Sequence, residues 1–163
     1  MPPSPLFEEL DYRETPLGPL ILRRRTLLAL DEREIHEVLL GDSYLMSSLF
    51  TVVEEALSQR GLAAASIAHP GAATLDVVVG GLGLGYTARA ALEHDSVASL
   101  TVIDYLEPVI EWHEKGLVPL GPGLVADPRC RFVHRDFFEW ALAPGESGNL
   151  LHAVLLDIDH SPA

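Results

Sequence analysis

The chain has 163 residues, of which 48% are hydrophobic and 21% charged, proportions typical of one globular domain with at most a small appendage. Its 11 basic and 24 acidic residues give a formal net charge of −13 with histidine neutral, which argues against a nucleic-acid partner because phosphate binding needs a basic surface. The single Cys130 excludes an internal disulfide, and no apolar run approaches the ~20 residues of a membrane span. We therefore expect a cytoplasmic protein that binds neither nucleic acid nor membrane.

Residues 1–62 are predicted to form a small N-terminal region of a β-hairpin and a helix. Apolar stretches at 16–30 and 34–40, separated by three polar residues, favour two strands. Apolar residues then recur at helical spacing from Met46 to Leu57, which predicts a helix that ends near Gly61. Residues 63–75 are mostly small and include proline and glycine, so they are predicted to be a linker.

From Asp76 onward, strands and helices are predicted to alternate. The expected strands cover 77–80, 100–104, 129–134 and 152–157, and the expected helices cover 86–94, 108–115 and 137–142. This alternation is typical of an α/β fold whose parallel strands are joined by right-handed crossovers. Ligands of such sheets bind beyond the carboxyl ends of the strands, so the candidate site residues are those that directly follow each strand.

A glycine-rich turn, GGLGLG at residues 80–85, follows the first of these strands. Gly81, Gly83 and Gly85 satisfy the glycine pattern of folds that bind S-adenosylmethionine. Gly83, Gly85 and Ala88 also satisfy the fingerprint of dinucleotide-binding folds. Both kinds of site need an acidic residue at the end of the second strand to hold ribose hydroxyls, and Asp104 occupies that place. The turn alone leaves three alternatives open: an adenosyl compound, NAD, or a tight turn without a ligand.

Two later carboxylates favour the adenosyl compound. Asp136 follows the third strand, where it could accept a hydrogen bond from an adenine amino group while Phe137 covers the ring. Asp157 follows the fourth strand, where a carboxylate can take the proton of an attacking amine. An NAD-dependent enzyme has no particular need of acids at both places.

In this order, four segments resemble the spermidine synthase family, the aminopropyltransferases of the S-adenosylmethionine-dependent methyltransferase fold. They are DVVVGGLGLGYTARAALEH at 76–94, SLTVIDYLEPVIEW at 99–112, DPRCRFVHRDFFEW at 127–140 and HAVLLDIDHSP at 152–162. The strands around residues 14–30 resemble the small β-domain of the family. The resemblance implies a Rossmann-like, methyltransferase-type parallel sheet with a small N-terminal β-rich domain.

The resemblance also implies a role for each candidate residue. The glycines at 81, 83 and 85 correspond to the family's glycine loop, and Asp104 corresponds to the acid that binds the ribose hydroxyls. Asp136 matches the acid that binds the adenine amino group, and Asp157 matches the catalytic aspartate that deprotonates the attacking amine. The donor would be S-adenosylmethionine or its decarboxylated form. The acceptor would be a small molecule, with a cationic amine of the polyamine type as the candidate.

Four positions depart from the pattern of the family. Leu84 stands where the family has an aspartate for the aminopropyl ammonium, and Met46 and Ser47 replace a Tyr-Gln pair that helps to hold the substrates. After Asp157, the second aspartate of the family is lost or shifted to Asp159. Each missing group would bind a substrate ammonium. Methyl transfer is therefore as consistent with the sequence as aminopropyl transfer.

The sequence stops six residues after the fourth expected strand, so residues 76–163 are expected to hold only the first four strands of a methyltransferase-type sheet. An apolar fourth strand left at the edge of a sheet is a pairing site. Either the chain is a truncation or a partner covers this edge, and we expect a homo-oligomer. The alternatives to a transferase are an NAD-dependent oxidoreductase and a catalytically silent module that binds an adenosyl compound or serves assembly.

Overall fold

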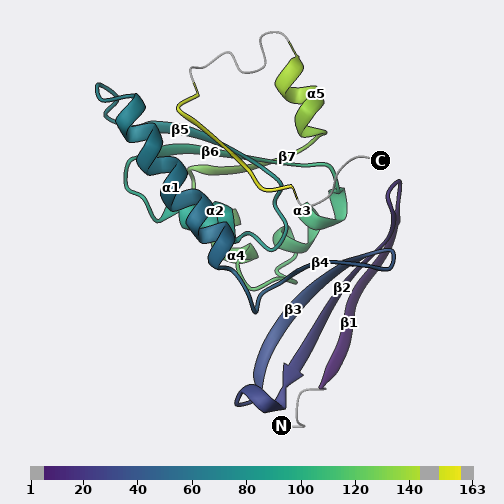
Figure 1. Ribbon diagram of the computed structural model, residues 1–163. Helices are drawn as coiled ribbons and strands as arrows, with labels where there is room; N and C mark the ends of the chain where they lie inside the picture. The colour runs from purple at the N-terminus through teal and green to yellow at the C-terminus, as the bar shows by residue number, and fades with distance from the viewer. Residues whose placement is uncertain (1–5, 144–150, 159–163) are drawn as a thin grey trace. The chain divides into compact units, whose positions relative to one another are not determined.

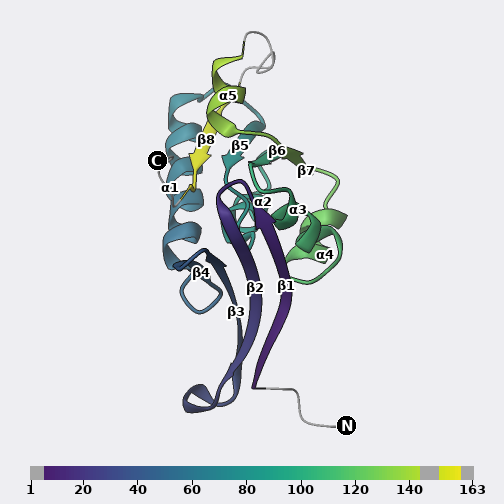
Figure 2. The same cartoon turned by 90° about the vertical axis from the view of Figure 1, so that its right-hand side faces the viewer.

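The structure of the protein is a computed structural model that describes residues 6–143 and 151–158. The chain divides into two compact units, Met1–Thr51 and Val52–Ala163. The first unit holds an antiparallel sheet, and the second holds a parallel sheet with helices (Figures 1 and 2). The predicted fold class, a Rossmann-like parallel sheet with a β-rich N-terminal region, is confirmed.

The first unit is a four-stranded antiparallel meander in the order β1-β2-β3-β4. Its strands are β1 (Phe7–Thr15), β2 (Gly18–Leu27), β3 (Arg33–Leu40) and β4 (Ser43–Ser47), with a short 3-10 turn at Leu28–Leu30. The strands β2 and β3 were expected, but β1 and β4 were not. The strand β1 alternates charged with apolar residues at the edge of the sheet, and β4 has only five residues, so neither carries a strong apolar pattern. Met46, the expected start of a helix, instead pairs with Val38 in the ladder.

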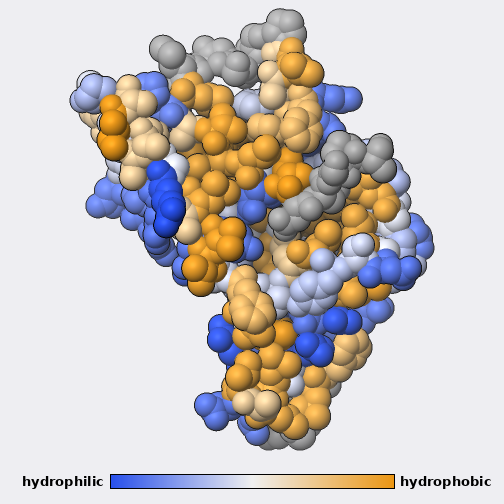
Figure 3. Space-filling view, viewed as in Figure 1, coloured by the Kyte–Doolittle hydropathy of each residue, from blue (hydrophilic) through white to orange (hydrophobic). Residues whose placement is uncertain are grey.

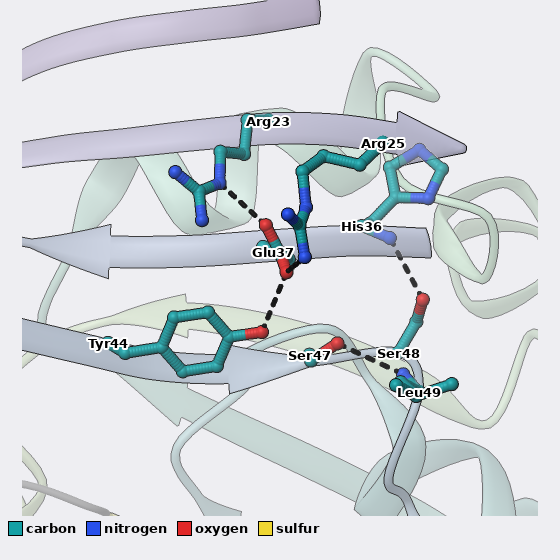
Figure 4. A network of polar contacts seen from close by, with 8 residues as sticks. All are labelled: Arg23, Arg25, His36, Glu37, Tyr44, Ser47, Ser48 and Leu49. Carbon is teal, nitrogen blue, oxygen red and sulfur yellow. Dashed lines mark hydrogen bonds and ion pairs between the residues drawn. The ribbon is translucent and has the colours of Figure 1, made fainter. Parts of the chain in front are cut away.

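One face of this antiparallel sheet carries a buried carboxylate, shown in Figure 4. The side chain of Glu37 on β3 is only 2% exposed. It accepts hydrogen bonds from Arg23 Nε at 2.6 Å, from an Arg25 terminal nitrogen at 2.9 Å and from the Tyr44 hydroxyl at 3.0 Å. Burial by itself would raise the pKa of Glu37. The hydrogen bonds from Arg23 and Tyr44 and the charges of both arginines outweigh burial, so the pKa is lowered.

Replacement of Glu37 by Gln should strongly destabilise the first unit. The two arginines would lose the charge that compensates them. Breaking a buried ion pair by removing one partner costs about 2–4 kcal/mol when the remaining partners are partly exposed, as Arg23 and Arg25 are. Urea unfolding followed by circular dichroism measures this cost. Glu34→Gln is the matched control, because Glu34 is 44% exposed and lies 3.6 Å from Arg24. The unfolding free energy of Glu34→Gln should fall by less than about 1 kcal/mol. Equal losses in the two variants would contradict the prediction.

The second unit is a parallel sheet in the order β7-β6-β5-β8, with the helices in the connections (Figure 1). Each neighbouring pair of strands is parallel, as the alternation of strands and helices predicts. Its elements are α1 (Val52–Ala68), β5 (Leu75–Gly80), α2 (Tyr86–Leu92), β6 (Val97–Asp104), α3 (Glu107–Glu114), α4 (Gly121–Ala126), β7 (Cys130–His134), α5 (Phe137–Leu142) and β8 (Ala153–Leu156).

The core of this unit lies around β5 and β6. On β5, Val77, Val78 and Val79 are each at most 1% exposed. Side chains on both faces of this strand are therefore buried. An unbroken apolar run is typical of the interior strand of a parallel sheet. The helix α1 packs against α2 and β8, and α3 packs against α4, β6 and β7. The carboxyl ends of β5, β6 and β8 thus lie side by side at one edge of a well-packed sheet.

The helix α1 is longer than the sequence pattern predicted. The expected stop at Gly61 is wrong, because α1 continues to Ala68 and includes residues 63–68 of the expected linker. A Cβ atom on Gly61 would lie 2.4 Å from Leu155 Cδ2. Glycine at this position therefore allows α1 to approach β8 closely rather than ending the helix. The alanines after it favour helix, which compensates the propensity cost of the glycine.

Apolar side chains also reach the surface beside β8. Val154 and Leu156 are about half exposed while Leu155 between them is buried, because successive residues of a strand point to opposite faces. Phe138 and Leu142 on α5 are exposed as well. Figure 3 shows hydrophobic residues, in orange, gathered on the visible surface over β8 and α5.

Over the described ranges, every helix falls short of the length and apolarity that crossing a membrane requires.

Candidate functional site

The predicted glycine turn forms a compact loop at the carboxyl end of β5. Its backbone is left-handed at Gly81, Gly83 and Gly85, with φ values of +97°, +50° and +91°, which residues with a Cβ atom rarely adopt. The two leucines between them, Leu82 and Leu84, are only 4% and 3% exposed. The leucines therefore anchor the loop in the core, and the glycines between them add no side chains to the loop.

Asp104 ties this loop to the neighbouring strand β6. Its Oδ2 atom accepts a hydrogen bond from the backbone N–H of Leu82 at 2.8 Å. Its Oδ1 atom accepts another from the backbone N–H of Leu106, also at 2.8 Å. The residue that the sequence analysis assigned to the ribose hydroxyls thus lies directly against the glycine loop. It also stabilises the conformation of that loop, a role that the sequence pattern did not predict.

Asp157, which follows β8, lies on the other side of the same loop. Its backbone N–H donates to the Gly80 carbonyl at 2.8 Å. A Cβ atom on Gly81 would lie 2.0 Å from the Asp157 carbonyl oxygen, so only glycine fits between the loop and this residue. The hydroxyl of Thr87, in the first turn of α2, donates to Asp157 Oδ2 at 2.5 Å. Sequence reasoning did not identify Thr87, because no motif or spacing marks it.

Asp136 and Phe137 follow β7 and begin α5. Asp136 is the N-cap of this helix, and its Oδ1 atom accepts from the backbone N–H groups of Phe138 at 2.7 Å and Glu139 at 3.0 Å. The Phe137 ring lies over the end of β5, since its Cδ2 atom would be 2.8 Å from a Cβ atom on Gly80. The structure therefore brings Phe137 to the glycine loop, with Asp136 beside it as a helix cap.

A buried histidine, His113 on α3, packs against Gly85 of the glycine loop. Its Nδ1 atom lies 2.9 Å from the Val109 carbonyl oxygen, and its Nε2 atom would lie 3.0 Å from a Cβ atom on Gly85. Burial lowers the pKa of His113 below its ordinary value, although the carbonyls of Val109 and Leu84 raise it in part. The imidazole is therefore neutral at neutral pH. Sequence reasoning missed this residue, because a lone histidine within a helix carries no signal.

The other residues considered in the sequence analysis contribute less to the candidate site. Burial raises the pKa of the Cys130 thiol to about 11, so this thiol is protonated at neutral pH and is a poor nucleophile. Within 6–143 and 151–158, no cluster of three or more histidine, cysteine or acidic side chains could hold a metal ion. Met46 and Ser47 lie on β4 of the first unit. Asp159 and His160 lie outside the described residues.

The chain is similar in sequence to curated polyamine aminopropyltransferases. It is 29% identical over 132 residues to that of Pyrobaculum islandicum and 28% identical over 136 residues to that of Pyrobaculum calidifontis. Each match covers 81% of this chain and 44% of the relative. In fold, the chain matches a spermidine synthase from Thermotoga maritima with a TM-score of 0.72 at 19% identity, over 94% of this chain and 48% of that one. The predicted resemblance to the spermidine synthase family is confirmed.

A second spermidine synthase, solved in complex with the transition-state analogue AdoDATO, matches with a TM-score of 0.60 at 20% identity, over 78% of this chain and 39% of that one. No model of a known protein family matches the chain. The chain spans about half the length of the curated relatives that it matches.

Replacement of Gly81 by Ala should destabilise the second unit by at least about 2 kcal/mol. An alanine is strained at the left-handed φ, and its methyl group would collide with the Asp157 carbonyl. Thermal or urea unfolding of the variant measures the loss. Gly71→Ala is the control, because a Cβ atom there has nothing within 4 Å, and its effect should stay within about 0.5 kcal/mol. If both variants are as stable as the natural chain, the loop geometry described here is wrong.

The stability of the second unit should fall with acidification through His113. The pKa of this imidazole is lowered in the folded chain, so the unfolded state binds the proton more tightly than the folded state. As the pH drops below about 6.5, the unfolded state takes up the proton first and is favoured. The stabilisation is complete above that pH and is lost as the pH falls toward the folded-state pKa. Unfolding measured by tryptophan fluorescence at pH 7.5 and pH 5 tests this expectation.

The control for that measurement is His113→Gln, which keeps a neutral donor near Val109 but cannot titrate. Its unfolding free energy should change less between the two pH values than that of the natural chain. His36 also has a pKa lowered by burial, but it is present in both proteins and cancels in the comparison. Identical pH dependence in the two proteins would show that His113 is not the titrating group.

Proposed function

We propose that the chain binds decarboxylated S-adenosylmethionine and transfers its aminopropyl group to a small amine acceptor. The observation that carries this proposal is the position of Asp157, whose backbone lies against the glycine loop and whose carboxylate accepts a hydrogen bond from Thr87. In this proposal Asp157 is the proton acceptor, and its position at the carboxyl edge of a parallel sheet, beside a glycine loop, supports that role. The similarity to curated polyamine aminopropyltransferases supports the reaction class.

The surrounding residues fit an adenosyl group. The glycine loop offers backbone at close range, and Asp104 lies at the end of the adjacent strand with its carboxylate against Leu82. In this proposal the ribose hydroxyls approach Asp104, the adenine amino group approaches Asp136, and the Phe137 ring covers the base. The Phe137 ring already lies over Gly80, at the start of the glycine loop.

The chemical step needs little from the protein beyond alignment and removal of one proton. The amine nitrogen of the acceptor attacks the carbon of the aminopropyl group that is attached to the sulfonium. The C–N bond forms as the C–S bond breaks, and the bonding electrons return to sulfur, which leaves as a neutral thioether. The proton of the attacking amine passes to the Asp157 carboxylate. The same negative charge attracts a cationic acceptor and helps to hold it in line with the leaving sulfur.

Leu84 supports a second candidate, methyl transfer from S-adenosylmethionine. The family's aspartate at this position would bind the aminopropyl ammonium and repel the carboxylate that distinguishes S-adenosylmethionine from its decarboxylated form. Leu84 is apolar and only 3% exposed, so the loop supplies neither the attraction nor the repulsion. The departure thus removes a barrier to S-adenosylmethionine as the donor.

Calorimetric titration of the full 163-residue chain tests the proposal, with decarboxylated S-adenosylmethionine, S-adenosylmethionine and NAD as separate ligands. We expect the decarboxylated donor to bind more tightly than NAD, and a radiolabelled aminopropyl group to appear on an added polyamine. Tighter binding of S-adenosylmethionine, with methyl transfer, would favour the second candidate. Binding of NAD alone, or of none of the three, would overturn the proposal.

Asp104→Asn should lower the affinity for the adenosyl donor at least about tenfold. The amide would lose one charge-assisted acceptor, and its NH₂ group would face a backbone N–H of Leu82 or Leu106. Asp95→Asn is the matched control, since it removes the same charge from an exposed residue in the turn before β6. Thermal unfolding of both variants shows whether they remain folded. An unchanged affinity in Asp104→Asn would exclude a binding role for this carboxylate.

A further inference from the structure

Thr87 makes a contact that joins two segments of the site that lie far apart in the sequence. It lies in the first turn of α2, is only 2% exposed, and donates its hydroxyl to Asp157 Oδ2 at 2.5 Å. Seventy residues separate the two in the chain. A hydrogen bond from a neutral hydroxyl to a carboxylate is charge-assisted and stronger than one between neutral groups. The bond is partly buried, and its donor lies in the interior, so it can hold the carboxylate in one orientation.

Thr87 is itself held in place by the helix α1. The hydroxyl of Ser58, which is fully buried, donates to the Thr87 carbonyl at 2.7 Å. The Thr87 hydroxyl lies 3.5 Å from the Glu54 carbonyl, a much longer approach than the 2.5 Å to Asp157. A hydroxyl has a single proton to donate, and the shorter contact to the charged acceptor is the stronger one. The β-branched side chain of threonine has few rotamers, so its direction is set by this packing.

We propose that Thr87 is the positioning residue of Asp157, and that it sets the orientation and the proton affinity of the carboxylate that takes the acceptor's proton. This inference rests on the proposed function, in which Asp157 is the general base. The hydrogen bond favours the ionised carboxylate, which is the form that can accept a proton at the start of the reaction. The bond also stops the carboxylate from turning away from the attacking amine.

Two substitutions separate positioning from packing. Thr87→Val keeps the shape of the side chain and removes the hydroxyl, whereas Thr87→Ser keeps the hydroxyl and removes a methyl group. A residue that only fills space would tolerate valine better than serine. A residue that positions Asp157 would tolerate serine and fail with valine. Thr101→Val is the matched control, because Thr101 is also a buried threonine whose hydroxyl bonds a side chain, that of Arg131 at 2.9 Å.

The primary measurement is a ¹³C NMR titration of aspartate carboxyl carbons in the natural chain and the three variants, with the Asp157 signal assigned by Asp157→Asn. We expect Thr87→Val to raise the titration midpoint of Asp157 by about one pH unit, because a charge-assisted hydrogen bond is lost. Thr87→Ser and Thr101→Val should leave the midpoint unchanged. An unchanged midpoint in Thr87→Val would overturn the inference, whether or not the chain is active.

The second measurement is steady-state aminopropyl transfer as a function of pH. In Thr87→Val, kcat should fall about 10- to 100-fold, with KM for the donor nearly unchanged and the acidic limb of the pH profile moved to higher pH. Thr87→Ser should restore kcat to within about threefold. A serine variant as slow as the valine variant would overturn the positioning role. If the natural chain transfers nothing while the NMR midpoint shifts as expected, the proposed function fails and the link from Thr87 to Asp157 stands.

Discussion

The candidate site depends above all on the pair of hydrogen bonds that Asp104 accepts from the backbone of Leu82 and Leu106. In the glycine loop, the backbone N–H groups of Gly81 and Gly85 donate to the Ile103 and Leu82 carbonyls, and a buried N–H without a partner is costly. The Asp104 carboxylate supplies the acceptor for Leu82 and thereby holds the loop against β6. The order of the strands then positions the other candidate residues. Because β6 and β8 flank β5, Asp104 lies on one side of the loop and Asp157 lies on the other.

Much of the second unit could be predicted from the sequence, because a parallel sheet leaves strong local signals. The run of valines in β5 and the glycines after it indicate a buried strand and a tight turn at one place. The first unit was harder to predict. The strand β1 carries many charges on an edge, and β4 is too short for its alternation to be distinguished from helical spacing at Met46. Gly61 resembled a helix end because its actual partner, Leu155, is nearly a hundred residues away in the chain.

For the site, sequence reasoning identified residues that follow strands, since topology alone brings strand ends together. Asp104 and Asp157 were found in this way, and both lie against the glycine loop. Thr87 and His113 were not found, because their roles arise from packing between helices and strands that no local pattern encodes. The N-cap role of Asp136 was missed for a related reason: an aspartate before a helix can cap that helix, bind a ligand or do both, and sequence spacing does not separate these uses.

The burial of Leu84 limits how a carboxylate could be introduced into the glycine loop by mutation. An aspartate introduced at this position would start in the apolar core under the loop, where an unpaired carboxylate is unfavourable and would favour either its protonated form or a rearranged loop. Recovering an ammonium-binding acid therefore requires the backbone around Gly83 and Gly85 to turn the side chain outward. A single substitution would therefore lower the stability of the loop before it placed a carboxylate at the loop surface.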